Sequence, residues 1–457
     1  MVKSFELNPT HENLIKTLVE NLLDRNDGVW HFARLCNGIE NKCSIALEAK
    51  WGEGKTFFIR HVQMLIESFN PFFTTITEED KITIQTLYSS YIGTGENAAV
   101  FDAQVCVYYD AWANDNDGDP ILSLIYAILQ SVAQNYKFKN SIDGIETAAL
   151  IADFFTGKNA SDIYALKQKT DPLAELKAQR EIFTLVNRLV DDLLNEQGNR
   201  LIVFIDELDR CKPDYAVQLL ERIKHYFSNE RITFVFSVNI DELQHTIKCH
   251  YGEGFDACRY LDRFFDFRIS LPPANMTRYY QRIGLDKSEA FEKACKVVVR
   301  EYGLGIRETE KFFRMAKIAA YKPTHGAQWG FDDENGKLFA RCFIVPIIIG
   351  LRMVDMKKYR DFIEGNDPQP MVSILTKGDF EHTITSLLRN EPTRMTNDEI
   401  TVSSIESILT DTYYAIFGTN EKQSWEAKKI GRCAFSVDTK EDLLQLASML
   451  SNQAQYD

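Results

Sequence analysis

The chain has 457 residues, which is long for one ordinary domain and predicts two or three. Apolar residues make up 45% and charged residues 26%, a balance typical of a soluble globular protein and not of a disordered or fibrous one. The 52 Lys and Arg residues against 66 Asp and Glu residues give a net charge of −14. Because bulk charge of this sign repels polyanions, binding to nucleic acid or to an anionic membrane is not indicated.

The cysteine pattern and the hydropathy predict a cytoplasmic protein without a membrane span. Nine cysteines are dispersed, no two have CxxC spacing, and the first residues are polar and unlike a secretory signal. The longest apolar runs, 148–155 and 343–351, are far shorter than the ~18–20 residues that cross a bilayer. One group of potential ligands matches no common zinc pattern, so we assign no metal to it: His245, Cys249, His250 and Cys258.

Strand-like and helix-like segments alternate through the first half of the chain. Leucines at helical spacing predict an amphipathic helix over residues 9–26. The run 43–48 predicts a short strand, and the apolar positions after it predict a helix that stops at Asn70-Pro71. A second strand is predicted over 104–109, followed by a helix over 121–133.

A polar segment, residues 136–172, is predicted to be an insert. Two helices and two apolar strands follow it, over residues 182–194 (helix), 201–205 (strand), 214–227 (helix) and 232–238 (strand). Fully apolar strands that alternate with helices predict a parallel sheet covered on both faces. Beyond Pro272-Pro273 helical periodicity prevails, so an α/β core is expected up to about residue 272, with a helical part after it.

The segment Gly52-Glu53-Gly54-Lys55-Thr56 follows the first strand and opens a helix, which is the context of a phosphate-binding loop. Its glycines let successive N–H groups surround a phosphate, and the helix N-terminus favours negative charge. Lys55 is expected to reach the β- and γ-phosphates, and Thr56 to offer its hydroxyl to Mg²⁺. The usual first glycine is replaced by Ala49, and a turn that reads GKT by chance is the alternative. We expect ATP and Mg²⁺ here, with the nucleotide held by Trp51, Gly52, Glu53, Gly54, Lys55, Thr56 and Phe57.

The apolar strand 201–205 ends in two carboxylates, Asp206 and Glu207. A carboxylate at such a strand end suits Mg²⁺, and a second one can orient and deprotonate an attacking water. An acidic helix start is the alternative, but it is weak beside a phosphate loop. Asp206, together with Thr56, is therefore the predicted magnesium residue, and Glu207 is the predicted catalytic base.

Asn239 follows the strand 232–238 and is a candidate sensor residue. A polar side chain at this strand end could lie between the two nucleotide elements and position the lytic water or the γ-phosphate. Asn at a strand end is also an ordinary helix cap, here before Asp241 and Glu242. We predict the sensor role and keep the cap as the alternative.

Together these motifs resemble the KAP family of P-loop NTPases, a branch of the additional-strand ATPases related to AAA+ proteins. Six stretches match in order over roughly residues 10–320: Ala49 to Thr56, Tyr109 to Trp112, Ile205 to Cys211, Phe234 to Asn239, Tyr260 to Phe265 and Gly305 to Phe313. The family often has Asp at position 239 and Asp-Asp at positions 206 and 207, and both replacements keep the chemistry possible. Some members carry transmembrane helices where this chain has its polar insert, so it resembles a soluble bacterial member.

The resemblance implies a P-loop NTPase three-layer core over residues 1–272, a helical lid over 273–325 and a helical C-terminal domain over 326–457. It also implies ATP hydrolysis with the help of arginines. Arg263 could reach a nucleotide in a neighbouring subunit, and Arg307 could sense nucleotide from the lid, although Arg is also ordinarily exposed. Arg210 could be a finger or a structural ion pair, and the sequence leaves both open.

Two functions are compatible with these motifs. The first is an ATPase that acts as the motor or timer of a larger assembly, as a homo-oligomer or with companion proteins, and the family resemblance suggests anti-phage defence. The second is a nucleotide-gated switch that binds ATP with little or no hydrolysis and licenses partner binding. The intact Asp206-Glu207 pair favours hydrolysis. The stretch 376–379 (TKGD) imitates a guanine-selecting motif, but it lies outside the core and predicts a solvated turn.

Overall fold

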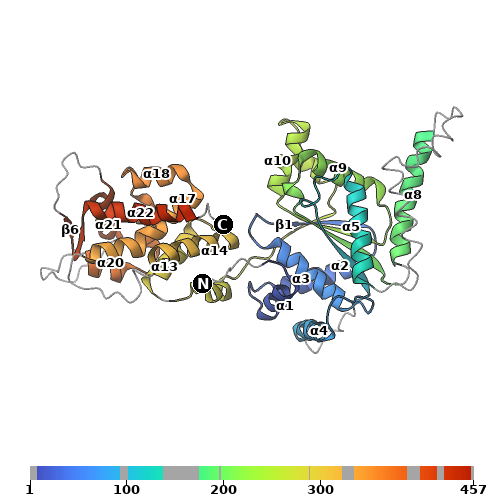
Figure 1. Cartoon of the computed structure of the whole chain (residues 1–457), viewed down its shortest axis with the longest axis horizontal. Helices are drawn as coiled ribbons and strands as arrows, with labels where there is room; N and C mark the ends of the chain where they lie inside the picture. Colours follow the sequence, from blue (N-terminus) through green and yellow to red (C-terminus); the bar gives the residue numbers. More distant parts are fainter. Residues whose placement is uncertain are drawn as a thin grey trace. The chain divides into compact units, whose positions relative to one another are not determined.

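The computed structural model divides the chain into two compact units, Leu7–Met276 and Thr277–Asp457. It describes residues 8–92, 101–136, 174–194, 197–287, 289–321, 334–388, 402–418 and 427–453. The predicted polar insert, 136–172, lies outside the described residues except for Tyr136. The first unit contains a sheet with helices around it, and the second is mainly helical (Figure 1).

Five parallel strands form the sheet of the first unit, in the order β2-β3-β4-β1-β5. Their bounds are Cys43–Glu48 (β1), Gln104–Asp110 (β2), Arg200–Asp206 (β3), Ile232–Val238 (β4) and Phe267–Ser270 (β5). β3 and β4 are buried along their whole length, which confirms the parallel sheet predicted from their apolar sequences. The edge strand β5 is absent from the sequence prediction, because it has only four residues and most of them are exposed.

Helices cover both faces of the sheet, as the three-layer prediction requires (Figure 1). The crossover from β1 to β2 runs in the opposite direction to the later crossovers, so right-handed connections place α3 on one face and the later helices on the other. α1, α2 and α4 pack against α3, whereas α5 and α8 pack on β2 and β3 and both contact α9, as does α10. The bounds are α1 (His11–Glu20), α2 (Asn26–Asn37), α3 (Lys55–Ser68), α4 (Glu78–Ile92), α5 (Pro120–Asn135), α8 (Ala174–Leu194), α9 (Pro213–Tyr226) and α10 (Ile240–Tyr251).

The helix predicted over residues 9–26 exists, but its predicted end is wrong: α1 covers His11–Glu20, a turn follows, and α2 begins only at Asn26. α1 ends where Asn21 adopts a left-handed conformation (φ 46°), which Asn tolerates better than most residues. Asp24 is also left-handed (φ 56°), and α2 begins two residues later. The side-chain amide of Asn26 donates to the carbonyl oxygen of Leu18 at 2.8 Å, which fixes the turn between the two helices.

The second unit consists of helices and one β-hairpin. The helices are α12 (Thr277–Ile283), α13 (Ala290–Glu301), α14 (Ile306–Ala316), α16 (Glu334–Phe339), α17 (Val345–Val354), α18 (Met356–Ile363), α19 (Gln369–Lys377), α20 (Glu381–Leu388), α21 (Val402–Phe417) and α22 (Val437–Gln453). β6 (Lys428–Ile430) and β7 (Cys433–Phe435) pair antiparallel. This hairpin is the exception to the predicted helical character, and its three-residue strands are too short to give a periodic signal.

An apolar stretch of the sequence forms the core of the second unit. Every residue from Cys342 to Leu351 is buried, mostly within α17.

Lys377, from the stretch that imitates a guanine-selecting motif, ends α19 and forms an ion pair with Glu301 on α13. Within the ranges that the structure describes, no helix is long and apolar enough to cross a membrane.

α3 carries the phosphate loop at its N-terminus and buries ionisable groups in its C-terminal half. Burial raises the pKa of Glu67 to about 8, although the amide of Gln63 donates to its Oε1 at 2.8 Å. Burial also lowers the pKa of His61 to about 4. Because Glu67 is protonated in the folded chain over a pH range where the unfolded chain is ionised, its burial makes stability depend on pH.

Glu67→Gln should stabilise the protein more and more as the pH rises. Between the ordinary carboxyl pKa of 4.5 and the folded pKa of about 8, unfolding releases a proton from Glu67, so the wild-type chain loses stability with rising pH and the variant does not. The relative gain at about pH 8 over about pH 5 should reach at least about 1.4 kcal/mol, the equivalent of one pKa unit. Differential scanning calorimetry measures it, with the exposed Glu230→Gln as control. Equal pH profiles for wild type and Glu67→Gln would contradict the assignment.

Candidate functional site

The loop between β1 and α3 bends at two glycines. Gly52 (φ 79°) and Gly54 (φ 86°) both adopt the left-handed conformation, which glycine reaches without the steric cost that other residues meet. Lys55, directly after Gly54, is the first residue of α3. The first N–H groups of a helix have no partner within it, so a curled loop at this position forms an anion site that suits phosphate.

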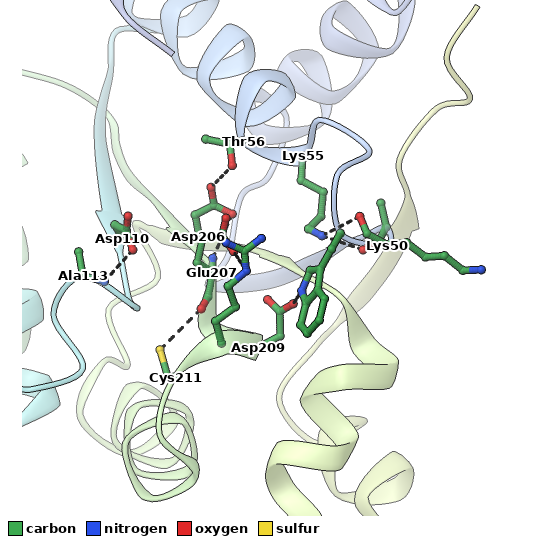
Figure 2. Close-up of polar contacts among 12 residues, drawn as sticks. Lys50, Lys55, Thr56, Asp110, Ala113, Asp206, Glu207, Asp209 and Cys211 are labelled. Atoms are coloured by element: carbon green, nitrogen blue, oxygen red, sulfur yellow. Dashed lines mark hydrogen bonds and ion pairs between the residues drawn. The ribbon is translucent and has the colours of Figure 1, made fainter. Parts of the chain in front are cut away.

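Lys55 is buried, and the loop itself holds its ammonium group. Nζ donates to the carbonyl oxygens of Ala49 (2.8 Å) and Lys50 (3.2 Å). Burial lowers the pKa of Lys55, and nearby carboxylates, Asp209 first among them, oppose that shift. The side chain of Lys50 points away from these carboxylates (Figure 2). Hydrogen bonds to a charged partner are stronger than those to neutral carbonyl groups, so Lys55 can exchange its present partners for phosphate oxygens.

Thr56, the second residue of α3, meets Asp206 at the end of β3 (Figure 2). The Thr56 hydroxyl donates to Asp206 Oδ2 at 2.6 Å, and the Tyr108 hydroxyl donates to the same oxygen at 3.1 Å. Asp206 is only 1% exposed. Hydroxyl and carboxylate oxygens are the hard donors that Mg²⁺ takes alongside phosphate oxygens and water, so this pair could hold that ion.

Glu207 follows Asp206 and has a left-handed backbone (φ 59°), which is uncommon for any residue but glycine. Its N–H donates to Asp206 Oδ1 at 3.1 Å. Burial, and after it the charge of Asp206, raises the pKa of Glu207 to about 7, while the nearby Arg210 opposes the shift. A carboxylate with this raised proton affinity is suited to act as a general base near neutral pH.

Arg210, whose role the sequence leaves open, forms an ion pair with Glu207 of its own chain: Nε lies 2.6 Å from Oε2. The guanidinium also lies 5.7 Å from the ring centroids of Trp51 and Trp112. Trp51 donates its Nε1–H to Asp209 Oδ2 at 2.5 Å. These contacts link the phosphate loop, the end of β2 and the end of β3 to one another.

The remaining predicted residues lie at three different places. Asn239 follows β4 at the sheet edge where Asp206 ends β3. It occupies the N-cap position of α10, but its side chain makes no capping bond there. Arg263 is exposed in the turn after α11 (Ala257–Leu261). Arg307 is exposed in the first turn of α14, in the second unit. The roles of these three residues stay predictions.

Three residues of the site are absent from the sequence prediction: Tyr108, Asp209 and Trp112. The signal that could have found Trp112 is the motif over residues 109–112, because it marks the end of a strand. Asp110 pairs in register with Asp206, so the end of β2 lies beside the end of β3. Asp209 lies in the matched stretch Ile205 to Cys211, which is the corresponding signal for it. Tyr108 shows no such signal, since its bond to Asp206 depends on which strands are neighbours.

The group of histidines and cysteines on α10 and α11 makes ordinary contacts. His250 Nδ1 lies 2.6 Å from Asp214 Oδ1, and Cys249 and Cys258 are exposed free thiols. In the described part of the chain, no group of three or more His, Cys, Asp and Glu side chains is arranged to hold a metal ion.

Comparisons with known proteins identify the domain. The family model of the KAP family P-loop domain matches residues 8–296. No curated protein gives a significant match. Among solved structures, the chain is similar to the Aeropyrum pernix ORC2 protein in ADPNP–ADP complexes, with 12% identity, a TM-score of 0.28 and coverage of 91% of this chain and 96% of that one.

Two further structures are similar at the same low level. The Aeropyrum pernix ORC1 protein in complex with DNA has 12% identity and a TM-score of 0.28, over 98% of this chain and 95% of that one. C. elegans PCH-2 has 8% identity and a TM-score of 0.19, over 88% of this chain and 69% of that one. Likenesses this weak carry no argument about the ligands of this chain.

Glu207 and Arg210 should be energetically coupled in the absence of nucleotide. Arg210→Gln leaves the half-buried Glu207 carboxylate beside Asp206 without its cation, so it should cost about 1–2 kcal/mol of stability. Adding Glu207→Gln to that variant should recover about 1 kcal/mol of the loss. Thermal unfolding of the wild type, both single variants and the double variant measures the coupling, with the exposed Arg259→Gln as control. Strictly additive losses would show that the ion pair contributes nothing to stability.

Proposed function

This chain belongs to the KAP family of P-loop NTPases, and we propose that it binds and hydrolyses ATP with Mg²⁺ as the motor or timer of a larger assembly. The observation that carries the proposal is the 2.6 Å contact between Thr56 and Asp206. Phosphoryl transfer to water needs the phosphates, the metal ion and the attacking water in one place. The contact supports this because it joins the phosphate loop to the acidic end of β3.

Each residue of the cluster has a distinct role in the proposal. Residues 51–57 bind the phosphates through backbone N–H groups, and Lys55 binds the β- and γ-phosphates. Thr56 and Asp206 hold Mg²⁺, which offsets negative charge on the phosphates when it is bound. Glu207 takes the proton of the attacking water, and Asn239 positions that water or the γ-phosphate from the end of β4.

Arginines complete the proposed site. Arg263, exposed after α11, reaches the nucleotide of a neighbouring subunit, and Arg307 reaches it from the helical unit; cations there stabilise the charge that develops on the γ-phosphate. Glu207 has to leave Arg210 before its carboxylate can accept a proton. Activity of the isolated chain would then depend on assembly, because one arginine comes from another subunit.

A second candidate function is a nucleotide-gated switch with little or no hydrolysis. The Glu207–Arg210 ion pair favours it, because a base that stays paired with a cation is a poor proton acceptor. In this case the occupancy of the loop alone would license the binding of a partner.

The cellular setting is proposed on weaker grounds. Family resemblance alone suggests anti-phage defence, together with companion proteins or further copies of this chain. All nine cysteines are free thiols, which suits the reducing cytoplasm. The net charge of −14 gives no support to nucleic acid as a partner.

Lys55→Ala should weaken ATP binding about 100-fold, whereas Lys50→Ala should leave it intact. Lys55 supplies a buried ammonium group to the loop, but the side chain of Lys50 is exposed and only its carbonyl oxygen takes part. Loss of a hydrogen bond to a charged group, about 3 kcal/mol, weakens the Kd about 100-fold. Isothermal titration calorimetry with ATP and Mg²⁺ measures the Kd. Equal weakening in both variants would show that the overall charge of the loop, and not Lys55, governs binding.

Glu207→Gln should retain ATP binding and lose hydrolysis by about 10²- to 10⁴-fold, the usual contribution of a general base. The measurement is phosphate release from ATP and from GTP, with and without Mg²⁺, across protein concentration. Turnover per chain that rises with concentration, and no longer rises in Arg263→Ala, would support an arginine supplied by a neighbouring subunit.

The same assay separates the two candidate functions. Tight ATP binding without turnover at any concentration, and unchanged cellular function in Glu207→Gln, would favour the switch. Wild-type protein that binds no nucleotide would contradict both candidates.

A further inference from the structure

The turn between α1 and α2 lies between the phosphate loop and the segment that leads into the helical unit. On one side, Arg25 Nη1 donates to the carbonyl oxygen of Glu53, in the phosphate loop, at 2.6 Å. On the other side, the N–H of Asn275 donates to the carbonyl oxygen of Leu23 at 2.9 Å. The amide of Asn275 also donates to Asp24 Oδ2 at 3.4 Å. We call residues 272–276 the linker, because the second unit begins at Thr277.

Arg25 holds the orientation of one peptide group in the phosphate loop by binding its carbonyl oxygen. The carbonyl oxygen that it binds belongs to the peptide between Glu53 and Gly54. In a planar trans peptide the N–H points opposite to the C=O, so the Glu53 carbonyl and the Gly54 N–H turn together. Gly54 is the left-handed residue before α3, and its N–H is one of the donors such a loop offers to phosphate. A phosphate that draws this N–H inward therefore moves the carbonyl oxygen that Arg25 holds.

Burying the charged side chain of Arg25 in this turn costs free energy. It is only 8% exposed, and burial lowers its pKa to about 10, which leaves the guanidinium charged at neutral pH. Its Nε has no hydrogen-bond partner among the described residues. A buried charge is expensive unless its hydrogen bonds are satisfied. The bond to the Glu53 carbonyl oxygen and the negative charge of the Glu53 side chain both offset the burial of this guanidinium.

Side-chain hydrogen bonds connect the two ends of the turn between α1 and α2. Asn21 and Asp24 have left-handed backbones (φ 46° and 56°), and the Asn21 amide donates to Asp24 Oδ1 at 3.1 Å. The N–H of Asn26 donates back to Asn21 Oδ1 at 3.1 Å. These bonds connect the residues on either side of Arg25 to one another, so they are the contacts through which a shift of the guanidinium would reach Leu23 and Asp24.

The linker is also pressed against α2. A Cβ added to Gly28 would lie 2.5 Å from Cγ of Pro272, closer than carbon atoms pack. Directly before the linker, the N–H of Leu271 donates to the carbonyl oxygen of Glu48 at 2.9 Å, next to the start of the phosphate loop. The turn and α2 thus contact the linker, and the residue before the linker is bonded to the end of β1, where the phosphate loop begins.

We propose that Arg25 is a positioning residue that couples nucleotide occupancy of the phosphate loop to the linker of residues 272–276. This inference rests on the proposed nucleotide binding. It names a route by which nucleotide occupancy reaches the segment that leads into the helical unit.

Hydrogen exchange of the full chain, with and without ATP and Mg²⁺, tests the coupling. In wild type, ATP should slow exchange of the Asn275 amide about fivefold or more, the lower end of ordinary allosteric coupling. Arg25→Gln should weaken ATP binding and remove the linker response, and Arg25→Lys, which can still donate to the Glu53 carbonyl, should restore both.

Gly28→Ala breaks the other end of the route and leaves the Arg25–Glu53 contact in place. Its added methyl group pushes Pro272 away and meets Phe58 Cε2 on α3 at 3.3 Å. The exchange response of the linker should therefore disappear, while the Kd for ATP should change by no more than the coupling itself, about fivefold. Gly38→Ala at the end of α2 is the matched control, because a Cβ there meets its nearest atom at 3.4 Å.

Three results would count against these expectations. A linker response that persists in both Arg25→Gln and Gly28→Ala overturns the coupling, and so does wild-type protein that binds ATP without any change in linker exchange. Should Arg25→Gln fail to fold, Gly28→Ala decides alone. Wild-type protein that does not bind ATP overturns the proposed function instead, and the inference with it.

Discussion

The hydrogen bond from Thr56 to Asp206 joins two residues that are 150 positions apart, and the site depends on it. It forms because β4 lies between β1 and β3 in a parallel sheet, so all three strands end at the same edge. β4 is apolar along its whole length, and burial on both faces holds it in the centre. The functional geometry is therefore a consequence of strand order, which the hydrophobic effect secures.

Charge balance sets the state of the site without nucleotide. The carboxylates of Asp206, Glu207 and Asp209 lie close to two cations, Lys55 and Arg210, and Arg210 is paired directly with Glu207. A nucleoside triphosphate would bring further negative charge, which the Mg²⁺ of the proposed function would offset. In the proposed function Lys55 and Arg210 would be drawn toward the phosphates by the same field, which would link nucleotide binding to release of the Glu207 carboxylate.

Sequence patterns predicted the parts of the fold that burial dictates. β3 and β4 are apolar throughout and were predictable, as were the loop at Gly52–Thr56 and the acidic pair after β3. The turn at Asn21 was not, because Leu22 and Leu23 continue the leucine spacing beyond the left-handed residue that ends α1. The bond from Tyr108 to Asp206 was also out of reach, since it depends on which strands are neighbours. The ion pair of Arg210 with Glu207 is local, between residues three positions apart, and a structural ion pair was one of the two roles that the sequence left open for Arg210.

The strained backbone of Glu207, at the end of β3, is a second indication that its carboxylate matters. Glu207 holds a left-handed conformation that costs on the order of 1 kcal/mol for a residue with a Cβ. Its N–H donates to Asp206 Oδ1, and its carbonyl oxygen accepts from the N–H of Arg210 at 3.1 Å, so local bonds maintain the conformation. Glycine would relieve the strain but would remove the carboxylate. The strained backbone is therefore the cost of keeping a carboxylate next to Asp206, which a relaxed glycine turn would lack.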